Sequence, residues 1–187
     1  MRDIGGCTVG LVGYGNIAKR VERIVIAMGT PPSRVLHTRT GDDGHPGWRT
    51  LPDLLAESDI VSLHLPLTEQ TSGLLDATAL AGMKPEAVVV NTSRGQIIDE
   101  GALVDALRSR RLAAAGLDVF AVEPIPAGNP LLSLDSVVLT PHVTWYTLDT
   151  MRRYLTEAVD SCRWLRDGRE LANVVNGIVV PNRPVNR

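Results

Sequence analysis

The sequence lacks a cysteine framework, a leader segment and any long apolar run. Cys7 and Cys162 are the two cysteines, and neither has a His or Cys at metal-ligand spacing beside it, so we expect two buried thiols and no metal site. No run of about 18 apolar residues occurs, so we expect no membrane partner. Because no charged-then-apolar leader opens the chain, we expect a reduced, cytoplasmic protein.

The sequence also lacks a strong net charge. Its 19 Lys and Arg residues nearly balance 21 Asp and Glu residues, which leaves a net charge of −2. Without a basic field, no nucleic-acid partner is expected. The composition, with 44% hydrophobic and 21% charged residues, is that of an ordinary globular protein. A chain of 187 residues is long enough for one hydrophobic core but short for two full domains. Small molecules or proteins are the expected partners.

The chain does contain a regular alternation of strand-like and helix-like segments. Strands are expected at 8–12, 34–38, 59–65, 87–93, 112–120 and 136–140, and helices at 16–28, 51–57, 76–81, 99–108 and 148–166. Strands rich in Val, Ile and Leu and separated by helices indicate a parallel sheet covered on both faces. The sequence therefore predicts an α/β fold with a doubly wound parallel sheet (Rossmann), formed by a single nucleotide-binding domain.

A cluster of glycines near the N-terminus carries the first functional signal. Glycine in a strand or helix costs about 0.5 to 1 kcal/mol relative to alanine, so Gly10, Gly13 and Gly15 indicate that something approaches this backbone closely. "GYGNIA", which is Gly13, Tyr14, Gly15, Asn16, Ile17 and Ala18, fits the G-x-G-x-x-A pattern between a strand and a helix. Such a loop seats a dinucleotide diphosphate at a helix N-terminus. A tight glycine turn without a ligand is the alternative.

The end of the second strand bears on the choice of dinucleotide. An Asp or Glu is expected there to bind the ribose 2′-hydroxyl of NAD, but Arg39 and Thr40 occupy this place. Arginine can bind a 2′-phosphate through charge-assisted hydrogen bonds, which favours NADP. NAD remains the alternative, because Asp42 and Asp43 follow closely and could reach a ribose. Arg39 could also be a solvated loop cation.

Several segments together resemble the nucleotide-binding domain of the D-isomer-specific 2-hydroxyacid dehydrogenases. They are "GLVGYGNIA", "DIVSLHLPLTEQTSGLL", "AVVVNTSRGQIIDEGALVDAL", "AAAGLDVFAVEP" and "LTPHVTWYT". The resemblance runs from about Thr8 to Val175, so we expect a dinucleotide-binding domain over 1–175 and a C-terminal crossover tail over 176–187. The family's catalytic Arg, Glu and His correspond to Arg94, Glu123 and His142.

The chemistry of the family explains why these residue types are needed. Reduction of a 2-keto acid requires a hydride, a proton for the developing alkoxide and a cation that holds the carboxylate. The resemblance implies that Arg94 holds the substrate, that His142 is the acid, and that Glu123 fixes the imidazole tautomer and favours its protonated form. Taken alone, a His after a proline or an Arg after "NTS" is more often a structural residue.

The resemblance also implies further contacts with the cofactor. Asp118 matches a position that contacts the nicotinamide carboxamide, although a carboxylate there could instead cap a turn. The remaining implied cofactor-binding residues are Leu65, Pro66, Thr71, Thr92, Ser93 and His142. His64 is expected to be packed or solvated, and His37 and His45 to lie on the surface or in loops. Trp145 and Tyr146 are expected either to shape a substrate pocket or to pack against the last helix.

The chain departs from the family pattern at its N-terminal end. Seven residues precede Thr8, where family members have most of a substrate-binding domain, so we expect that domain to be largely absent. The first functional hypothesis is an oxidoreductase acting on a small 2-keto or 2-hydroxy acid such as glyoxylate, hydroxypyruvate or pyruvate. The second is a cofactor-sensing module without useful turnover. The resemblance also implies a homodimer.

Overall fold

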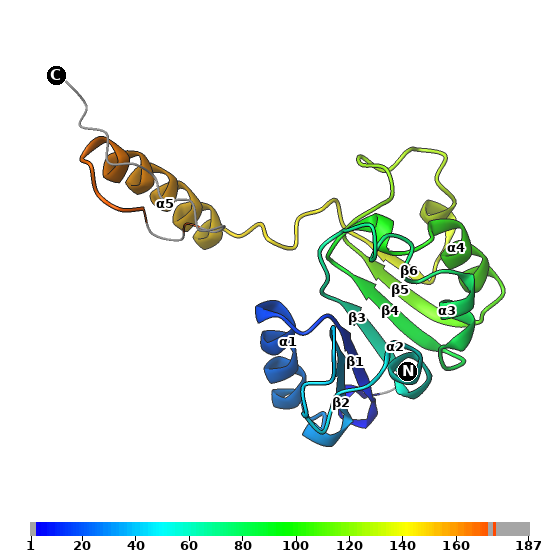
Figure 1. The fold of residues 1–187 in the computed structure, drawn as a ribbon. Helices are drawn as coiled ribbons and strands as arrows, with labels where there is room; N and C mark the ends of the chain where they lie inside the picture. Colours follow the sequence, from blue (N-terminus) through cyan, green and yellow to red (C-terminus); the bar gives the residue numbers. More distant parts are fainter. Residues whose placement is uncertain (1–2, 172–173, 175–187) are drawn as a thin grey trace. The chain divides into compact units, whose positions relative to one another are not determined.

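The computed structural model describes residues 3–171 and 174, and it contains one parallel sheet of six strands in the order β2-β1-β3-β4-β5-β6 (Figure 1). The strands are β1 (Val9–Val12), β2 (Val35–Thr38), β3 (Ile60–Leu63), β4 (Ala87–Asn91), β5 (Leu112–Leu117) and β6 (Val137–Leu139). Every neighbouring pair is parallel. The doubly wound parallel sheet that the sequence predicts is therefore confirmed.

A helix lies between each successive pair of the first five strands, and another follows β6. They are α1 (Asn16–Ala27), α2 (Leu51–Glu57), α3 (Ala77–Gly82), α4 (Glu100–Arg108) and α5 (Leu148–Arg166), with short 3-10 turns at η1 (Ile4–Gly6), η2 (Pro32–Arg34), η3 (Gly95–Ile97) and η4 (Pro130–Ser133). Four helices start at a side chain that accepts a hydrogen bond from the backbone three residues later: Thr50, Asp76, Asp99 and Thr147. Such caps satisfy N–H groups that a helix leaves open.

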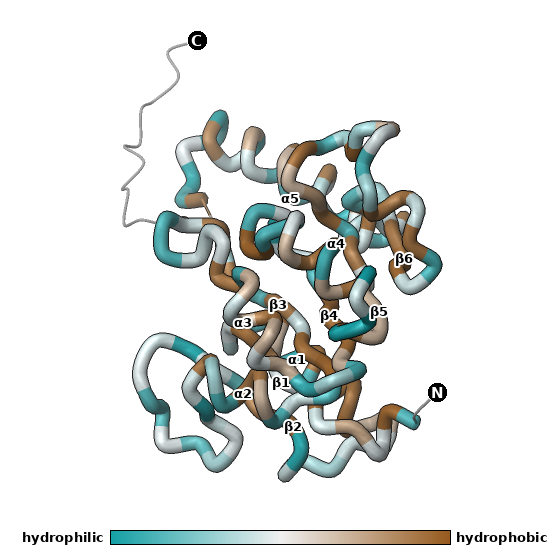
Figure 2. Tube along the Cα trace, turned by 90° about the vertical axis from the view of Figure 1, so that its right-hand side faces the viewer, coloured by the Kyte–Doolittle hydropathy of each residue, from teal (hydrophilic) through white to brown (hydrophobic). Residues whose placement is uncertain are grey.

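The two faces of the sheet are covered unequally. Helices α2, α3 and α4 pack side by side over one face, above the larger apolar core, whereas α1 lies on the other side against β1 and β2 (Figure 1). Figure 2 shows hydrophobic residues along the central strands. Both faces of β1 are buried, but Val88 and Val90 of β4 are only partly buried and Val138 of β6 is 70% exposed. Within residues 3–144 the central strand β1 is therefore covered on both faces, as the sequence predicts.

Close packing explains one glycine of the N-terminal cluster. A Cβ on Gly10 would overlap the side chains of Ser58 and Leu54, which come from α2 and its C-terminal end. Here the expected close approach is therefore made by the protein itself. Gly10 allows α2 to lie against β1.

The contact pattern divides the chain into two compact units, Met1–Thr144 and Trp145–Arg187. The second unit contains α5, which buries none of its residues in the described structure. Cys162 of α5 is exposed, so the expectation of two buried thiols holds for Cys7 alone. The domain boundary at 175 stays a prediction, and the expected tail at 176–187 lies outside the described residues. Over the described part of the chain, no helix combines the length and apolar character needed to cross a membrane.

Candidate active site

Most of the predicted site residues follow the carboxyl end of a strand. The glycine loop follows β1, Arg39 and Thr40 follow β2, Leu65 and Pro66 come just after β3, Thr92, Ser93 and Arg94 follow β4, Asp118 follows β5, and His142 comes shortly after β6. Because the strands are parallel, these residues lie along one edge of the sheet. This edge is where open α/β sheets bind their ligands. Thr71 belongs to the loop after β3, where its hydroxyl donates to the Pro66 carbonyl at 2.7 Å.

The glycine loop has the geometry of an anion cradle. Gly13 has φ +89°, and a Cβ there would lie 2.6 Å from the His64 carbonyl oxygen, so no other residue fits. A Cβ on Gly15 would meet no atom within 4 Å, so the side of the loop at Gly15 is open. Gly15 precedes α1, and no side chain caps this helix. The open N–H groups of the first turn and the room at Gly15 fit a dinucleotide diphosphate.

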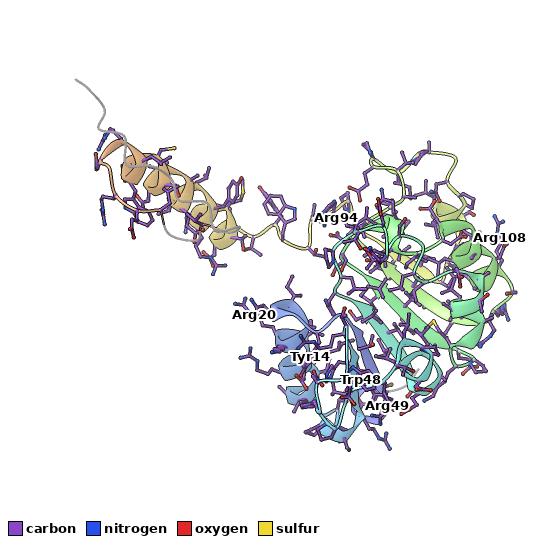
Figure 3. All side chains as sticks on the ribbon, viewed as in Figure 1. Tyr14, Arg20, Trp48, Arg49, Arg94 and Arg108 are labelled. Carbon is purple, nitrogen blue, oxygen red and sulfur yellow. The ribbon has the colours of Figure 1, made fainter. Side chains whose placement is uncertain are left out.

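Tyr14 of the same loop turns towards β2 (Figure 3). Its ring stacks on the His37 ring at a centroid distance of 3.6 Å, and its hydroxyl donates to Glu22 at 2.6 Å. Burial and this hydrogen bond raise the pKa of Tyr14 to about 12. His37 is 1% exposed and its Nε2 lies 3.0 Å from Asp43 Oδ2. The expected surface or loop position of His37 is therefore wrong, because Tyr14 covers it within β2.

The end of β2 presents a cation and a carboxylate together. Arg39 Nη1 lies 4.0 Å from Asp43 Oδ2, and the Arg39 side chain is 51% exposed. Burial of Asp43 acts to raise its pKa, but hydrogen bonds from His37 and the His45 amide and the charge of Arg39 lower it overall. Asp42 turns away to accept from the Gly44 amide at 2.8 Å. A cation suited to the 2′-phosphate of NADP and a carboxylate suited to the 2′-hydroxyl of NAD thus lie side by side.

Glu123 and His142 form a direct pair. His142 Nδ1 lies 2.8 Å from Glu123 Oε2, and the other carboxylate oxygen accepts from the Phe120 amide at 3.0 Å. The hydrogen bonds from His142 and Phe120 hold the pKa of Glu123 below its usual range, and the positive charge of Arg94 adds to this lowering. The structure therefore brings Glu123 and His142 into direct contact, and the charge of Arg94 acts on the same carboxylate.

Asn91 shapes the loop that carries Arg94. Asn91 is 1% exposed at the end of β4, its Oδ1 accepts from the Ser93 amide at 3.0 Å, and its Nδ2 donates to the Arg94 carbonyl at 2.9 Å. Ser93 in turn donates from its hydroxyl to the Leu63 carbonyl at 2.6 Å. Sequence reasoning missed Asn91; a lone polar residue closing a buried strand was the available signal.

Glu100 holds the loop that carries Glu123. Its carboxylate accepts from the Ala121 amide at 3.2 Å and from Asn129 Nδ2 at 2.7 Å. From the sequence, the acidic residues at the start of α4 are expected only to interact favourably with the positive end of the helix dipole. The contacts across the loop depend on segments far apart in the sequence, so the local pattern could not reveal them.

Two other features adjoin this edge. His64 Nε2 is buried and has no hydrogen-bond partner among the described residues, and burial lowers the pKa of His64. A cavity of about 510 Å³ lies beside Glu123 and His142. Its remaining lining residues are Phe120, Pro124, Ile125, Leu139, Thr140 and Pro141. Among the described residues no group of three or more His, Cys, Asp or Glu side chains could hold a metal ion.

A parallel α/β sheet with an open glycine loop at its carboxyl edge defines the class of dinucleotide-binding domains. The chain belongs to the D-isomer specific 2-hydroxyacid dehydrogenase family, whose NAD binding domain model matches residues 1–144. Its cofactor class is accordingly a nicotinamide dinucleotide. The resemblance stated from the sequence is therefore confirmed.

Known relatives place this domain within longer proteins. A glyoxylate reductase of Aeropyrum pernix is 40% identical over 188 residues, covering 97% of this chain and 55% of that protein. The crystal structure of a D-lactate dehydrogenase with NAD+ from Lactobacillus jensenii is similar with a TM-score of 0.84 and 31% identity, covering 94% of this chain and 57% of that one. An acyclic imino acid reductase in complex with NADPH has a TM-score of 0.78 and 32% identity over 87% of this chain and 52% of its own. The chain spans about half the length of these relatives.

Proposed function

We propose that this chain supplies the cofactor domain and the catalytic side chains of an oxidoreductase that transfers a hydride between NADP(H) or NAD(H) and a small 2-keto or 2-hydroxy acid. The observation that carries the proposal is the Glu123–His142 pair, with Arg94 close enough to act on the Glu123 charge, at the same sheet edge as the glycine loop. Glyoxylate, hydroxypyruvate and pyruvate are the substrates to test, and the named relative that reduces glyoxylate supports this choice.

Each of the three side chains has a task that its chemistry suits. Arg94 binds the substrate carboxylate and polarises the neighbouring carbonyl through its fixed positive charge. Glu123 accepts the Nδ1–H of His142, and Nε2 is the atom that we assign to give a proton to the alkoxide on reduction and to take it back on oxidation. A bound nicotinamide ring supplies or accepts the hydride. The negative charge of Glu123 stabilises the imidazolium that this proton transfer needs.

The cofactor would be held by the loops along the sheet edge. Gly13, Tyr14, Gly15, Asn16 and Ile17 bind the diphosphate through the backbone and the start of α1. Arg39 and Thr40 bind a 2′-phosphate, so we propose NADP as the preferred cofactor and NAD as the alternative. The remaining proposed contacts are Leu65, Pro66, Thr71, Thr92, Ser93, Asp118 and His142. The NADPH complex of the imino acid reductase shows that a domain of similar fold accepts the phosphorylated form.

Replacement of the proposed acid tests the reaction. We expect His142→Ala to lower kcat for glyoxylate or hydroxypyruvate by about 10² to 10⁴-fold, the usual contribution of a general acid. Turnover would be followed by NADPH or NADH absorbance. Near-normal turnover of His142→Ala would remove His142 from the mechanism.

A cofactor-sensing module is the second candidate, because the open glycine loop would bind a dinucleotide with or without turnover. Dinucleotide binding measured by fluorescence, with no turnover of any of the three keto acids, would support it. Measurable turnover by the same preparation would exclude it.

The choice between NADP and NAD is tested at Arg39. Loss of a charge-assisted contact typically removes about 1.5 to 3 kcal/mol, so Arg39→Asp should weaken NADPH binding about 10- to 100-fold relative to NADH. The dissociation constants of both dinucleotides would be measured by protein fluorescence, with Arg152→Asp on an exposed position of α5 as the control. An unchanged ratio of the two constants would refute the 2′-phosphate assignment.

A further inference from the structure

Glu100, the first residue of α4, contacts both ends of the loop that carries Glu123, residues 121–129, which we call the Glu123 loop. Its Oε2 accepts from the Ala121 amide at 3.2 Å, and its Oε1 accepts from Asn129 Nδ2 at 2.7 Å. Most of the residues between these two contacts are exposed. One carboxylate therefore anchors an otherwise exposed loop at its start and at its end.

The chemistry of the two contacts requires a carboxylate. Both partners are donors, and a carboxylate only accepts. Asn129 keeps its donor towards Glu100 because its Oδ1 already accepts from the Leu131 amide at 2.9 Å, at the start of η4. Hydrogen bonds to a charged acceptor are also stronger than those between neutral groups. Glutamate therefore matches both ends of the loop, whereas a neutral glutamine of the same shape matches one.

The start of α4 is itself fixed to the core. Ile97 and Ile98, which come just before it, are buried. The Asp99 amide donates to the Leu75 carbonyl at 3.1 Å, and the Asp99 side chain caps the helix. Because these contacts fix the base of Glu100, its carboxylate restrains the loop instead of moving with it.

The restraint reaches the Glu123–His142 pair through two adjacent peptide groups. Glu100 holds the Ala121 amide, and the neighbouring Phe120 amide donates to Glu123 Oε1 at 3.0 Å. The other oxygen of Glu123 lies 2.8 Å from His142 Nδ1. A shift of the peptide group held by Glu100 would therefore change the direction of the carboxylate that faces the imidazole.

The segment that restrains the Glu123 loop also carries Arg94. Gly95 packs so closely against the loop that a Cβ there would lie 2.5 Å from the Ala121 nitrogen. Gln96 Nε2 donates to the Ala121 carbonyl at 3.0 Å. The chain from Arg94 to Glu100 thus meets the start of the loop through backbone packing, a neutral hydrogen bond and a charged one.

We propose that Glu100 is a positioning residue for the Glu123–His142 pair: its carboxylate fixes the Glu123 loop so that Glu123 faces the imidazole, and it acts from the segment that carries Arg94. The inference rests on the proposed function for its catalytic consequence. Glu100 touches neither substrate nor cofactor in that function. If Glu100 only stabilised the fold, its loss would ease unfolding but would leave kcat unchanged at temperatures where the chain is folded.

Glu100→Gln tests the carboxylate with a side chain of the same shape. The glutamine can accept from the Ala121 amide but turns an N–H₂ towards the Asn129 donor. We expect kcat for glyoxylate or hydroxypyruvate to fall about 10-fold, because a misplacement of about 1 Å can cost about 10²-fold. KM and the dissociation constants of NADH and NADPH should change less than about threefold. Unchanged kcat in the folded variant would overturn the proposal.

Asp99→Asn is the matched control at the neighbouring position. It also removes one negative charge from the start of α4, but asparagine caps a helix as well as aspartate does. The Asp99 side chain accepts from the Ala102 amide, within its own helix. We therefore expect the kcat of the parent chain in Asp99→Asn. A loss of kcat equal to that in Glu100→Gln would assign the effect to charge at the helix start and would overturn the proposal.

Asn129→Asp alters the same contact from the side of the loop. It keeps an acceptor for the Leu131 amide but loses the donor to Glu100, so kcat should again fall about 10-fold. Combined with Glu100→Gln, it restores both contacts, because the glutamine N–H₂ can donate to the carboxylate at 129 while its oxygen accepts from Ala121. The double variant should return kcat to within about threefold of the parent.

A double variant no more active than either single variant would overturn the proposal. If Glu100→Gln alone does not fold, Asn129→Asp and the double variant decide the outcome.

A readout without turnover keeps the inference separate from the proposed function. The ¹⁵N NMR shifts of labelled His142, assigned by comparison with His142→Ala, report which ring nitrogen carries the proton. We expect one tautomer, protonated at Nδ1, in the parent chain, Asp99→Asn and the double variant, and a mixture in Glu100→Gln and Asn129→Asp. A parent chain that binds the dinucleotide without turnover would contradict the proposed oxidoreductase, whereas unaltered His142 shifts in both single variants would contradict the positioning role.

Discussion

Arg39 and Asp43 show how a single residue can adjust the proposed cofactor preference. Asp43 is held in place by buried His37, so its carboxylate stays beside Arg39 and near the position proposed for a 2′-phosphate. Its negative charge should oppose the phosphate and should compete for the Arg39 guanidinium. An exposed pair of this kind is typically worth about 0.2 to 1 kcal/mol.

We therefore expect Asp43→Asn to strengthen NADPH binding relative to NADH by about threefold, in line with the small energies of exposed pairs. Asp42→Asn is the matched control, because Asp42 caps the Gly44 amide instead. Titration of both dinucleotides at low salt gives the ratio of dissociation constants. Equal shifts in the two variants would mean that only the net charge of the loop matters.

Asp118 also links the site to stability. The folded state lowers its pKa below the usual 3.8, so its ionised form contributes stability that is present above that value and is lost as pH falls through the lowered pKa. We expect the unfolding free energy to decline below about pH 4, and more steeply in the parent chain than in Asp118→Asn. Urea unfolding at several acid pH values measures both slopes. Identical slopes would contradict the contribution assigned to this carboxylate.

At the scale of elements, the turn from β1 into α1 separates a structural glycine from a ligand-facing one. Gly13 has a positive φ, and a Cβ there would clash with neighbouring atoms, so the fold itself requires glycine at this position. Gly15 has φ −88°, and a Cβ there would meet open space, so the need for glycine at this position comes from a ligand that approaches the loop. The two positions stand two residues apart and should respond differently to the same substitution.

We expect Gly13→Ala to destabilise the chain by about 1 to 3 kcal/mol, the cost of a strained backbone, even without ligand. Gly15→Ala should change the free energy of unfolding by less than about 1 kcal/mol but should weaken dinucleotide binding, since its methyl group enters the open side of the cradle. Thermal unfolding without ligand and fluorescence titration distinguish the two effects. Unchanged binding in Gly15→Ala would argue that the diphosphate lies elsewhere.

At the scale of the whole molecule, apolar side chains remain on the surface of each compact unit. In the first unit, Ile17 and Ile24 of α1 and Met28, which follows α1, are more than half exposed. In the second, Leu148, Tyr154 and Leu155 of α5 are also more than half exposed. Groups of exposed apolar residues mark surfaces that associate with a partner.

A homodimer, as the family resemblance implies, is the association that we propose. Light scattering coupled to size-exclusion chromatography should then give about twice the 20.2 kDa chain mass at micromolar concentration. A constant monomer mass over a hundredfold range of concentration would contradict the homodimer.

The sequence by itself determined the order of strands and helices, the glycine loop and the Glu123–His142 pair. These features are encoded in short patterns: apolar periodicity, a turn that needs Gly13, and ordered motifs whose strands end at one edge of a parallel sheet. The strand predicted at 112–120 ran too far, because Asp118 leaves the sheet to meet the segment after β6.

Only the tertiary structure decided what surrounds these residues. His37 looked like a surface histidine but lies buried beneath Tyr14, and the carboxylate of Asp118, predicted as a cofactor contact, also accepts four hydrogen bonds from residues 140–144. The physical reason is that burial and hydrogen-bond saturation depend on which distant segments meet. A local pattern shows which donor or acceptor a residue carries, whereas the packed structure decides which group that donor or acceptor bonds to.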